Sequence, residues 1–221
     1  MMHLYVSPGA CCLGAHVVAR ELDLPVKVVV VPLRVADSPI HRVNPLGRVP
    51  ALELADGTVI TENSAILPYL ADQRPGTSLF APMGTRERAA IQSWIGYLSA
   101  EVHAAAFRPI NRPERYSRDP DAHEGIRRRG REQLESALQY VNRHLEARHY
   151  LVGGRFSIAD AYLGVFARWT AALGGEFADL TAIHRFRRAF EDRASVRAAL
   201  AVEAGVAKPI MLHRRFGVSL G

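Results

Sequence analysis

The residues best suited to chemistry are two adjacent cysteines at the end of a short turn. Cys11 and Cys12 follow Ser7-Pro8-Gly9-Ala10, which separates a strand candidate from a helix candidate. A cysteine at a helix N-terminus lies beside unpaired N–H groups and the positive end of the helix dipole, and both favour an anion. Such thiols have a lowered pKa and act as nucleophiles. The position therefore predicts a reactive Cys11, and a small buried apolar residue is the structural alternative.

Cys12 stands one step further into the expected helix, about 100° around its axis. We therefore expect it to pack inside the protein. The pair lacks the C-x-x-C spacing of dithiol redox enzymes, which disfavours a two-cysteine oxidoreductase. Two adjacent cysteines also cannot build a disulfide framework.

Two further segments could bind a small peptide. Val49-Pro50 begins an expected strand, and since proline cannot donate to a sheet ladder, an edge or turn position follows, with a cis bond as one option. The Val49 backbone would then be open to an extended ligand. Glu62-Asn63-Ser64 opens an expected helix, where N–H groups can hold a carboxylate and Glu62 can take an ammonium. A γ-glutamyl peptide carries both groups, and simple helix capping is the alternative.

The elements that must position these residues change character near residue 75. The first part predicts strands at 3–6, 26–31, 51–54 and 59–61, and helices at 13–22 and from Asn63 or Ser64 onward. Both of those residues are good N-caps, whereas Pro68 should distort the helix behind them. The valine-rich segment 26–31 is typical of a strand buried on both faces. Residues 33–47 read as irregular.

The second part reads as helical throughout. Apolar residues recur there with the spacing of amphipathic helices, namely Ile91, Ile95, Leu98 and Val102, then Leu134, Leu138, Val141 and Leu145, then Ile183, Phe186 and Phe190. Ser157-Ile158-Ala159-Asp160 has the form of a helix N-terminal cap. We expect an α/β domain at 1–76, a linker at 77–84, an all-helical domain at 85–204 and a tail at 205–221.

Composition excludes several classes of protein. The 221 residues are 48% hydrophobic with a net charge of +6, as in an ordinary globular protein. No run reaches the roughly 18 apolar residues of a membrane span, and no signal peptide is evident, so we expect a cytoplasmic protein that does not bind membranes. Nine histidines show no metal-ligand spacing with the cysteines, so no metal is expected. No phosphate-binding loop of Walker or Rossmann form is present.

One segment is very basic and admits two interpretations. It contains Arg108, Arg112, Arg115 and Arg118, followed by Arg127-Arg128-Arg129 and Arg131. Few aromatic residues interleave and no nucleic-acid-binding motif accompanies them, so we expect no nucleic-acid partner. A solvated helix face and loop is the favoured interpretation. A field that attracts an anionic ligand is the alternative.

Several motifs together resemble glutathione S-transferases. These are Ser7-Pro8-Gly9-Ala10-Cys11, Asn44-Pro45-Leu46-Gly47-Arg48-Val49-Pro50-Ala51-Leu52, Thr61-Glu62-Asn63-Ser64-Ala65-Ile66, Trp94-Ile95-Gly96-Tyr97 with Glu101-Val102-His103, and Arg155-Phe156-Ser157-Ile158-Ala159-Asp160-Ala161-Tyr162. Their order matches the family from residue 3 to about residue 204. A cysteine at the start of the first helix is most similar to the bacterial beta class.

The resemblance implies a thioredoxin-like domain followed by an all-helical domain, in a homodimer that uses glutathione as co-substrate. It implies that Cys11 faces the glutathione sulfur and that the Val49 backbone, before a cis Pro50, pairs with the cysteinyl part. It implies that Glu62 and Asn63, at the helix start with Ser64, hold the γ-glutamyl end. His103 would lie near the sulfur, where an imidazolium would favour a thiolate.

The implied reaction transfers the glutathione sulfur to an electrophilic small molecule, as in detoxification, or exchanges it through a Cys11 mixed disulfide. Two rivals remain. One is a glutathione-dependent thiol reductase of glutaredoxin type, and the other is a non-catalytic binding or regulatory protein on the same fold. Ala104 stands where the family often has a lysine and Gly96 where it often has an asparagine, which favours the second rival slightly.

Overall fold

The computed structural model describes residues 1–206, and residues 207–221 lie outside the described part. Most of the tail expected at 205–221 therefore falls outside it. The last described helix, α9 (Ala194–Val206), includes Gly205 and Val206, the first two residues of that expected tail. No helix within residues 1–206 is long and apolar enough to cross a membrane.

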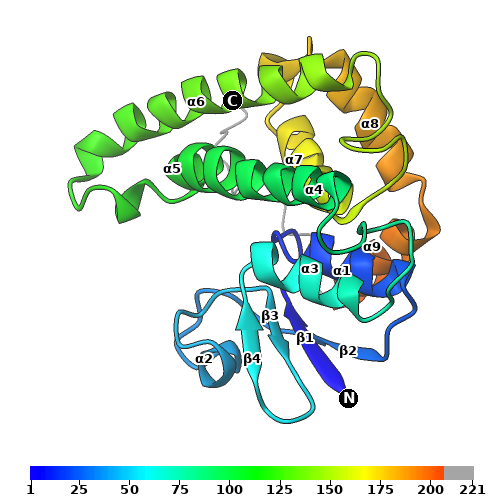
Figure 1. Ribbon diagram of the computed structural model, residues 1–221. Helices are drawn as coiled ribbons and strands as arrows, with labels where there is room; N and C mark the ends of the chain where they lie inside the picture. The colour runs from blue at the N-terminus through cyan, green and yellow to red at the C-terminus, as the bar shows by residue number, and fades with distance from the viewer. Residues whose placement is uncertain (207–221) are drawn as a thin grey trace.

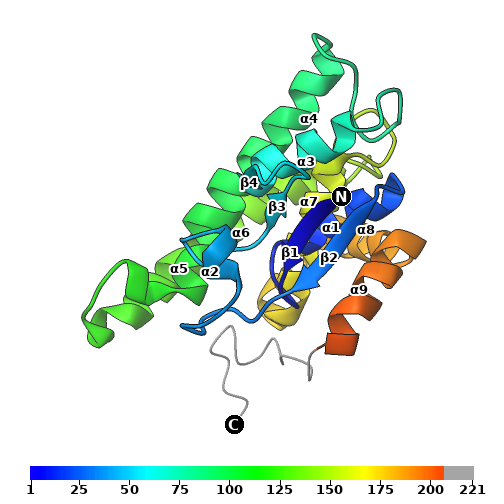
Figure 2. The same ribbon diagram turned by 90° about the horizontal axis from the view of Figure 1, so that it is seen from below.

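The first part of the chain folds around a four-stranded mixed sheet in the order β2-β1-β3-β4. Its strands are β1 (Met2–Val6), β2 (Val26–Val30), β3 (Ala51–Glu53) and β4 (Val59–Thr61). The helix α1 (Leu13–Glu21) crosses between β1 and β2, which are parallel, whereas β3 is antiparallel to both of its neighbours. Figure 2 shows β1 and β2 side by side in front of α1. The expected α/β arrangement is confirmed.

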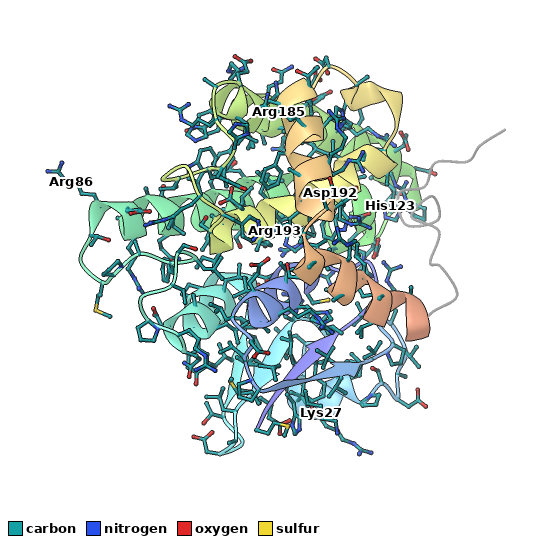
Figure 3. All side chains as sticks on the ribbon, turned by 90° about the vertical axis from the view of Figure 1, so that its right-hand side faces the viewer. Lys27, Arg86, His123, Arg185, Asp192 and Arg193 are labelled. Carbon is teal, nitrogen blue, oxygen red and sulfur yellow. The ribbon has the colours of Figure 1, made fainter. Side chains whose placement is uncertain are left out.

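The strand β2 is not buried on both faces, so that expectation is wrong. It lies at the edge of the sheet and pairs only with β1, and its valines are half-buried. Lys27 within it is exposed and is labelled in Figure 3. A charged residue on an edge strand discourages pairing with another chain. A run of valines indicates a strand, but it does not show whether that strand lies at the edge or in the centre of the sheet.

Helices cover the sheet and continue into the second part. Figure 1 shows α1 and α3 between the sheet and the long helices α4 and α6. The remaining helices are α2 (Ile40–Val43), α3 (Asn63–Asp72), α4 (Arg86–Tyr97), the π-helix η1 (Leu98–Phe107), α5 (Arg108–Asn111), the 3-10 turns η2 (Pro113–Arg115), η3 (Pro120–Ala122) and η4 (Gly175–Phe177), α6 (His123–Leu145), α7 (Ile158–Ala172) and α8 (Thr181–Glu191).

The helix α3 begins at Asn63, as expected, but the residue that caps it differs from the expectation. Neither Asn63 nor Ser64 is the N-cap, because both already belong to the helix. Glu62 is the N-cap, with φ of 68°, and its side chain makes no capping hydrogen bond. A positive φ is unfavourable for a residue with a Cβ atom, which marks Glu62 as a strained position. Pro68 does not end α3, which continues to Asp72.

The three apolar stripes expected in the second part are all buried, as the periodicity predicts. The cap before α7 is also confirmed. Asp160 accepts hydrogen bonds from the Ser157 backbone N–H at 2.9 Å and from the Ser157 hydroxyl at 2.7 Å. Its other oxygen accepts from the Leu151 N–H at 2.9 Å. Because α7 is buried along most of its length, these bonds fix its position in the core.

The last helix ties the two parts of the chain together. Helix α9 packs against α1, and Arg193, just before it, donates to both oxygens of Glu21 at 2.8 and 2.9 Å. Figure 3 labels Arg193 beside Asp192, where α8 gives way to α9. A two-pronged arginine–carboxylate contact is directional as well as attractive. The α9 helix therefore docks on the sheet-containing part in one orientation.

Burial of His16 predicts an acid-sensitive fold. His16 lies on α1 and is 1% exposed, and Arg20 donates to its Nε2 at 2.9 Å. Burial and the Arg20 charge lower its pKa to about 4, below the ordinary value near 6.5. The folded state thus binds this proton more weakly than the unfolded chain, so stability is full above pH 6.5 and falls toward pH 4.

The loss attributable to His16 is at most roughly 3 kcal/mol, from about 1.4 kcal/mol per pKa unit. In His16→Gln the amide oxygen still accepts from Arg20 but does not titrate. We expect urea unfolding to show a shallower fall in the free energy of unfolding between pH 6.5 and 4 in this variant than in the wild type. Parallel pH profiles for the two proteins would contradict the assignment.

Candidate active site

A cavity of about 590 Å³ lies where the sheet-containing part meets the helices that follow it. Most of the residues singled out from the sequence line it together, namely Cys11, Val49, Pro50, Glu62, Asn63 and His103. Ser64 is not among its lining residues. The fold thus gathers residues from three separate loops and one distant helix at one place. Such concave sites between structural layers are where small ligands bind.

Cys11 lies in the turn between β1 and α1, one residue before the N-cap, which is Cys12. Its side chain is 9% exposed and its Sγ donates to the Val49 carbonyl at 3.4 Å. The thiol is therefore placed on the cavity wall beside the backbone segment expected to hold a peptide. It lies close to the helix N-terminus without belonging to the helix itself.

Cys12 is fully buried and turned away from the cavity. Its Sγ lies 3.3 Å from both the N–H and the carbonyl of Ser7. Burial raises the pKa of this thiol, and the nearby Cys11 and Glu203 raise it further. A protonated buried thiol is a poor nucleophile. The structure agrees with the expected packing role of Cys12.

Both backbone polar groups of Gly9 are held by residues from the far end of the chain. The Gly9 N–H donates to Glu203 on α9 at 2.9 Å, and the Gly9 carbonyl accepts from the Trp169 indole on α7 at 3.1 Å. Glycine suits this position, because its φ of 69° lies in the left-handed region. We call these two contacts the Gly9 clamp. The clamp fixes the turn that carries Cys11.

The start of α3 approaches the same turn. The Asn63 side chain is buried and its Nδ2 donates to the Cys11 carbonyl at 3.1 Å. Asn63 therefore braces the Cys11 turn, a role that its neighbourhood in the sequence does not reveal. Glu62 next to it is exposed at the cavity and offers a carboxylate. Across the cavity, the Val49–Pro50 peptide bond is cis, as expected.

His103 lies in the π-helix η1 and faces the cavity from the helical side. Its Nδ1 is 3.2 Å from the Tyr162 hydroxyl, and its ring packs near Phe166 and Trp169. Burial and the Arg108 charge lower the pKa of His103 to about 4. Without glutathione the ring is therefore neutral at neutral pH, and its expected role beside a glutathione thiolate stays a prediction. A neutral ring can still donate one N–H to an anionic sulfur.

Tyr162 and Trp169 on α7 line the cavity and were missed at the sequence level. Tyr162 ends the motif that begins at Arg155, so its position in that motif was the available signal. It is buried, and burial together with the nearby Cys11 raises the pKa of its hydroxyl, which keeps it a proton donor. It lies within reach of His103 and therefore joins the polar side of the cavity.

The basic segment divides between two roles. The arginines on α6 lie on the surface, where Arg127 and Arg129 pair with Glu124 and Glu132, as the favoured interpretation expected. Arg108, Arg112 and Arg115 line the cavity, where Arg108 and Arg112 are half-buried and Arg115 is exposed, so attraction of an anionic ligand stays open for them as the alternative. They do not share one helix, because Arg108 begins α5, Arg112 follows α5 outside the helix and Arg115 ends η2. Arg34 and Arg48 add to the basic lining from the other side.

Comparison with known proteins supplies the family. Residues 9–73 match the model described as "Glutathione S-transferase, N-terminal domain" and residues 124–199 the model described as "Glutathione S-transferase, C-terminal domain". The chain is 39% identical to glutathione S-transferase GstA of Escherichia coli O157:H7 over 206 residues, which covers 91% of this chain and 98% of that protein.

Solved structures agree with the sequence matches. A sphingomonad glutathione S-transferase complexed with glutathione superimposes with a TM-score of 0.82 at 34% identity, covering 93% of this chain and 100% of the other. The bacterial beta class glutathione S-transferase of Sphingomonas chungbukensis gives a TM-score of 0.82 at 33% identity, covering 92% and 100%. The expected architecture, a thioredoxin-like part followed by a helical part, is confirmed.

Proposed function

We propose a mode of action from the premise that this chain belongs to the glutathione S-transferase family. It is a glutathione transferase, which binds glutathione and delivers its sulfur to an electrophile or exchanges it in a disulfide. The observation that carries our assignment of the site is one cavity that brings together Cys11, the Val49 backbone, Glu62 and His103. These residues offer a thiol, a backbone pairing edge, a carboxylate and a neutral N–H donor.

In the proposed complex, the γ-glutamyl ammonium pairs with Glu62 and its carboxylate lies at the N-terminus of α3, where helix N–H groups favour an anion. The cysteinyl part lies against the backbone of Val49. The sulfur then faces Cys11, with His103 and the Tyr162 hydroxyl in the same cavity. Hydrogen bonds from neutral donors stabilise a thiolate without a formal positive charge.

The finer organisation is also a proposal. We propose residues 1–76 as the glutathione-binding domain, 77–84 as the linker and 85–204 as the helical domain. We further propose a cytoplasmic homodimer that needs glutathione and an electrophilic small molecule, with no metal, nucleic acid or membrane partner. The dimer proposal rests on the family resemblance alone.

Replacing Glu62 tests the proposed glutathione site. Glu62→Ala is expected to weaken glutathione binding by about 1.5–3 kcal/mol, the range for a hydrogen bond to a charged group. Glu62→Gly should weaken it equally, yet it should hold or raise the free energy of unfolding by about 1 kcal/mol, because glycine relieves the positive φ. Titration calorimetry measures binding and urea unfolding measures stability. Unchanged affinity in both variants would remove Glu62 from the site.

The proposed dimer has a direct test. Light scattering at micromolar concentration is expected to give about twice the chain mass of 24.4 kDa. A measured mass of one chain would refute the dimer without affecting the assignment of the glutathione site.

A further inference from the structure

Four arginines form a cationic wall on the helical side of the cavity and beside Val49. They are Arg48 in the segment before β3, Arg108 on α5, Arg112, and Arg115 at the end of η2. All four line the same cavity. Burial lowers the pKa of Arg115, and the charges of Arg48, Arg112 and Arg108 lower it further. The three arginines are therefore close enough to Arg115 to repel its charge. We call this set the arginine wall.

The arginine wall carries more positive charge than the carboxylates paired with it neutralise. Arg112 pairs with Glu114 at 3.4 Å. Within residues 1–206, no carboxylate forms an ion pair with Arg48, Arg108 or Arg115, and the buried Nε of Arg48 has no hydrogen-bond partner. Like charges held together in a partly enclosed cavity repel one another. An anionic ligand would relieve that repulsion.

Glutathione alone does not account for the wall. It carries two carboxylates and one ammonium at neutral pH. The γ-glutamyl carboxylate and ammonium are assigned to α3 and Glu62 in the proposed complex, on the opposite wall. The glycyl carboxylate remains, and Arg48 next to Val49 is suitably placed for it. Arg108 and Arg115 also line the cavity, and no group of glutathione is assigned to them in that complex.

We propose that the electrophile is an anion, with a carboxylate or a similar planar anionic group bound by Arg108 and Arg115. This inference rests on the proposed function and assigns its substrate class. When the electrophile is an aryl halide, the glutathione sulfur forms a bond to the ring carbon that bears the halogen, and the carbon–halogen bond breaks. The halide leaves with the electron pair, and the thiol proton passes to solvent. The arginines form and break no bond. They bind the anionic group and so orient the carbon toward the sulfur.

A matched pair of electrophiles tests the proposal. 4-Chloro-3,5-dinitrobenzoate and 4-chloro-3,5-dinitrobenzamide share a reactive ring and differ in charge. In Arg108→Gln/Arg115→Gln we expect kcat/KM for the benzoate to fall at least about tenfold, as for loss of a charged hydrogen bond. For the benzamide the fall should be at least about threefold smaller than for the benzoate, since any effect of the lost Arg108 charge on His103 acts on both electrophiles. Arg129→Gln, on the exposed face of α6, is the matched control and should change neither.

Each other outcome has a definite meaning. Equal losses for both electrophiles, or a loss confined to the KM for glutathione, would overturn the proposal and leave the transferase function intact. If neither electrophile reacts, calorimetry with the two glutathione conjugates decides. Tighter binding of the carboxylate conjugate that disappears in the double variant supports the proposal, and equal binding overturns it. Failure to bind glutathione or either conjugate would instead refute the proposed glutathione site.

Discussion

Oxidised glutathione is expected to add one glutathionyl group to the protein, on Cys11. The Cys11 thiolate attacks one sulfur of the disulfide, a new sulfur–sulfur bond forms, and glutathione thiolate leaves. Cys11 lies on the cavity wall, whereas Cys12 is fully buried and its pKa is raised. Cys11→Ser should therefore abolish the adduct and all thiol exchange. Conjugation should survive in this variant, because there the attacking sulfur belongs to glutathione.

Cys12→Ser is the matched control, since it removes the neighbouring thiol and should leave the adduct in place. Intact-mass spectrometry counts the added groups, and fragmentation between the two cysteines locates them. A reducing agent should reverse the modification. An adduct on Cys12 alone, or none in excess oxidised glutathione, would overturn Cys11 as the reactive residue. Exchange activity without any conjugation would favour the reductase alternative over the transferase.

The largest stability effect is expected at Asp160. Its carboxylate is fully buried and accepts hydrogen bonds from two backbone N–H groups and one hydroxyl. Asp160→Ala leaves those donors buried without an acceptor, which we expect to cost about 3–5 kcal/mol. Because α7 carries Tyr162 and Trp169 to the cavity, glutathione binding should weaken along with the fold.

Asp119 provides the matched control for Asp160. It also caps a short helix, by accepting from the Asp121 N–H at 3.0 Å, but it is exposed. Asp119→Ala should cost only about 0.5–2 kcal/mol, the usual range for an N-cap. Urea unfolding measures both variants. A cost for Asp160→Ala no greater than that for Asp119→Ala would show that burial of the cap contributes nothing.

The sequence predicts most of the elements because their boundaries carry local signals. Pro8 and Gly9 mark the turn before α1, the Asp56-Gly57 pair marks the hairpin, and Ser157 with Asp160 marks the start of α7. The π-helix η1 carries no such signal. Leu98 and Val102 have the spacing of an α-helix. Only the backbone of the folded chain shows that Leu98–Phe107, which includes His103, is the wider π-helix.

The sequence points to site residues that belong to a recognisable motif. It does not reveal residues whose surroundings depend on how separate elements pack together. The sequence shows that Arg108, Arg112 and Arg115 are close along the chain but not whether they meet solvent or a cavity. The charge of His103 depends on the aromatic rings and Arg108 around it, which come from separate elements. The positive φ of Glu62 is likewise a property of the folded backbone.

The Gly9 clamp joins the Cys11 turn to residues that are synthesised later, so the position of the Cys11 thiol depends on the order of synthesis. A ribosome builds the Cys11 turn well before Trp169 and Glu203, the residues that hold Gly9. Because domains fold as they are made, the sheet can form before α7 and α9 exist. Until those helices dock, Gly9 lacks its hydrogen bonds to Glu203 and Trp169. The turn that carries Cys11 is therefore synthesised before the residues that fix it, and a partly made chain carries this thiol in an incomplete site.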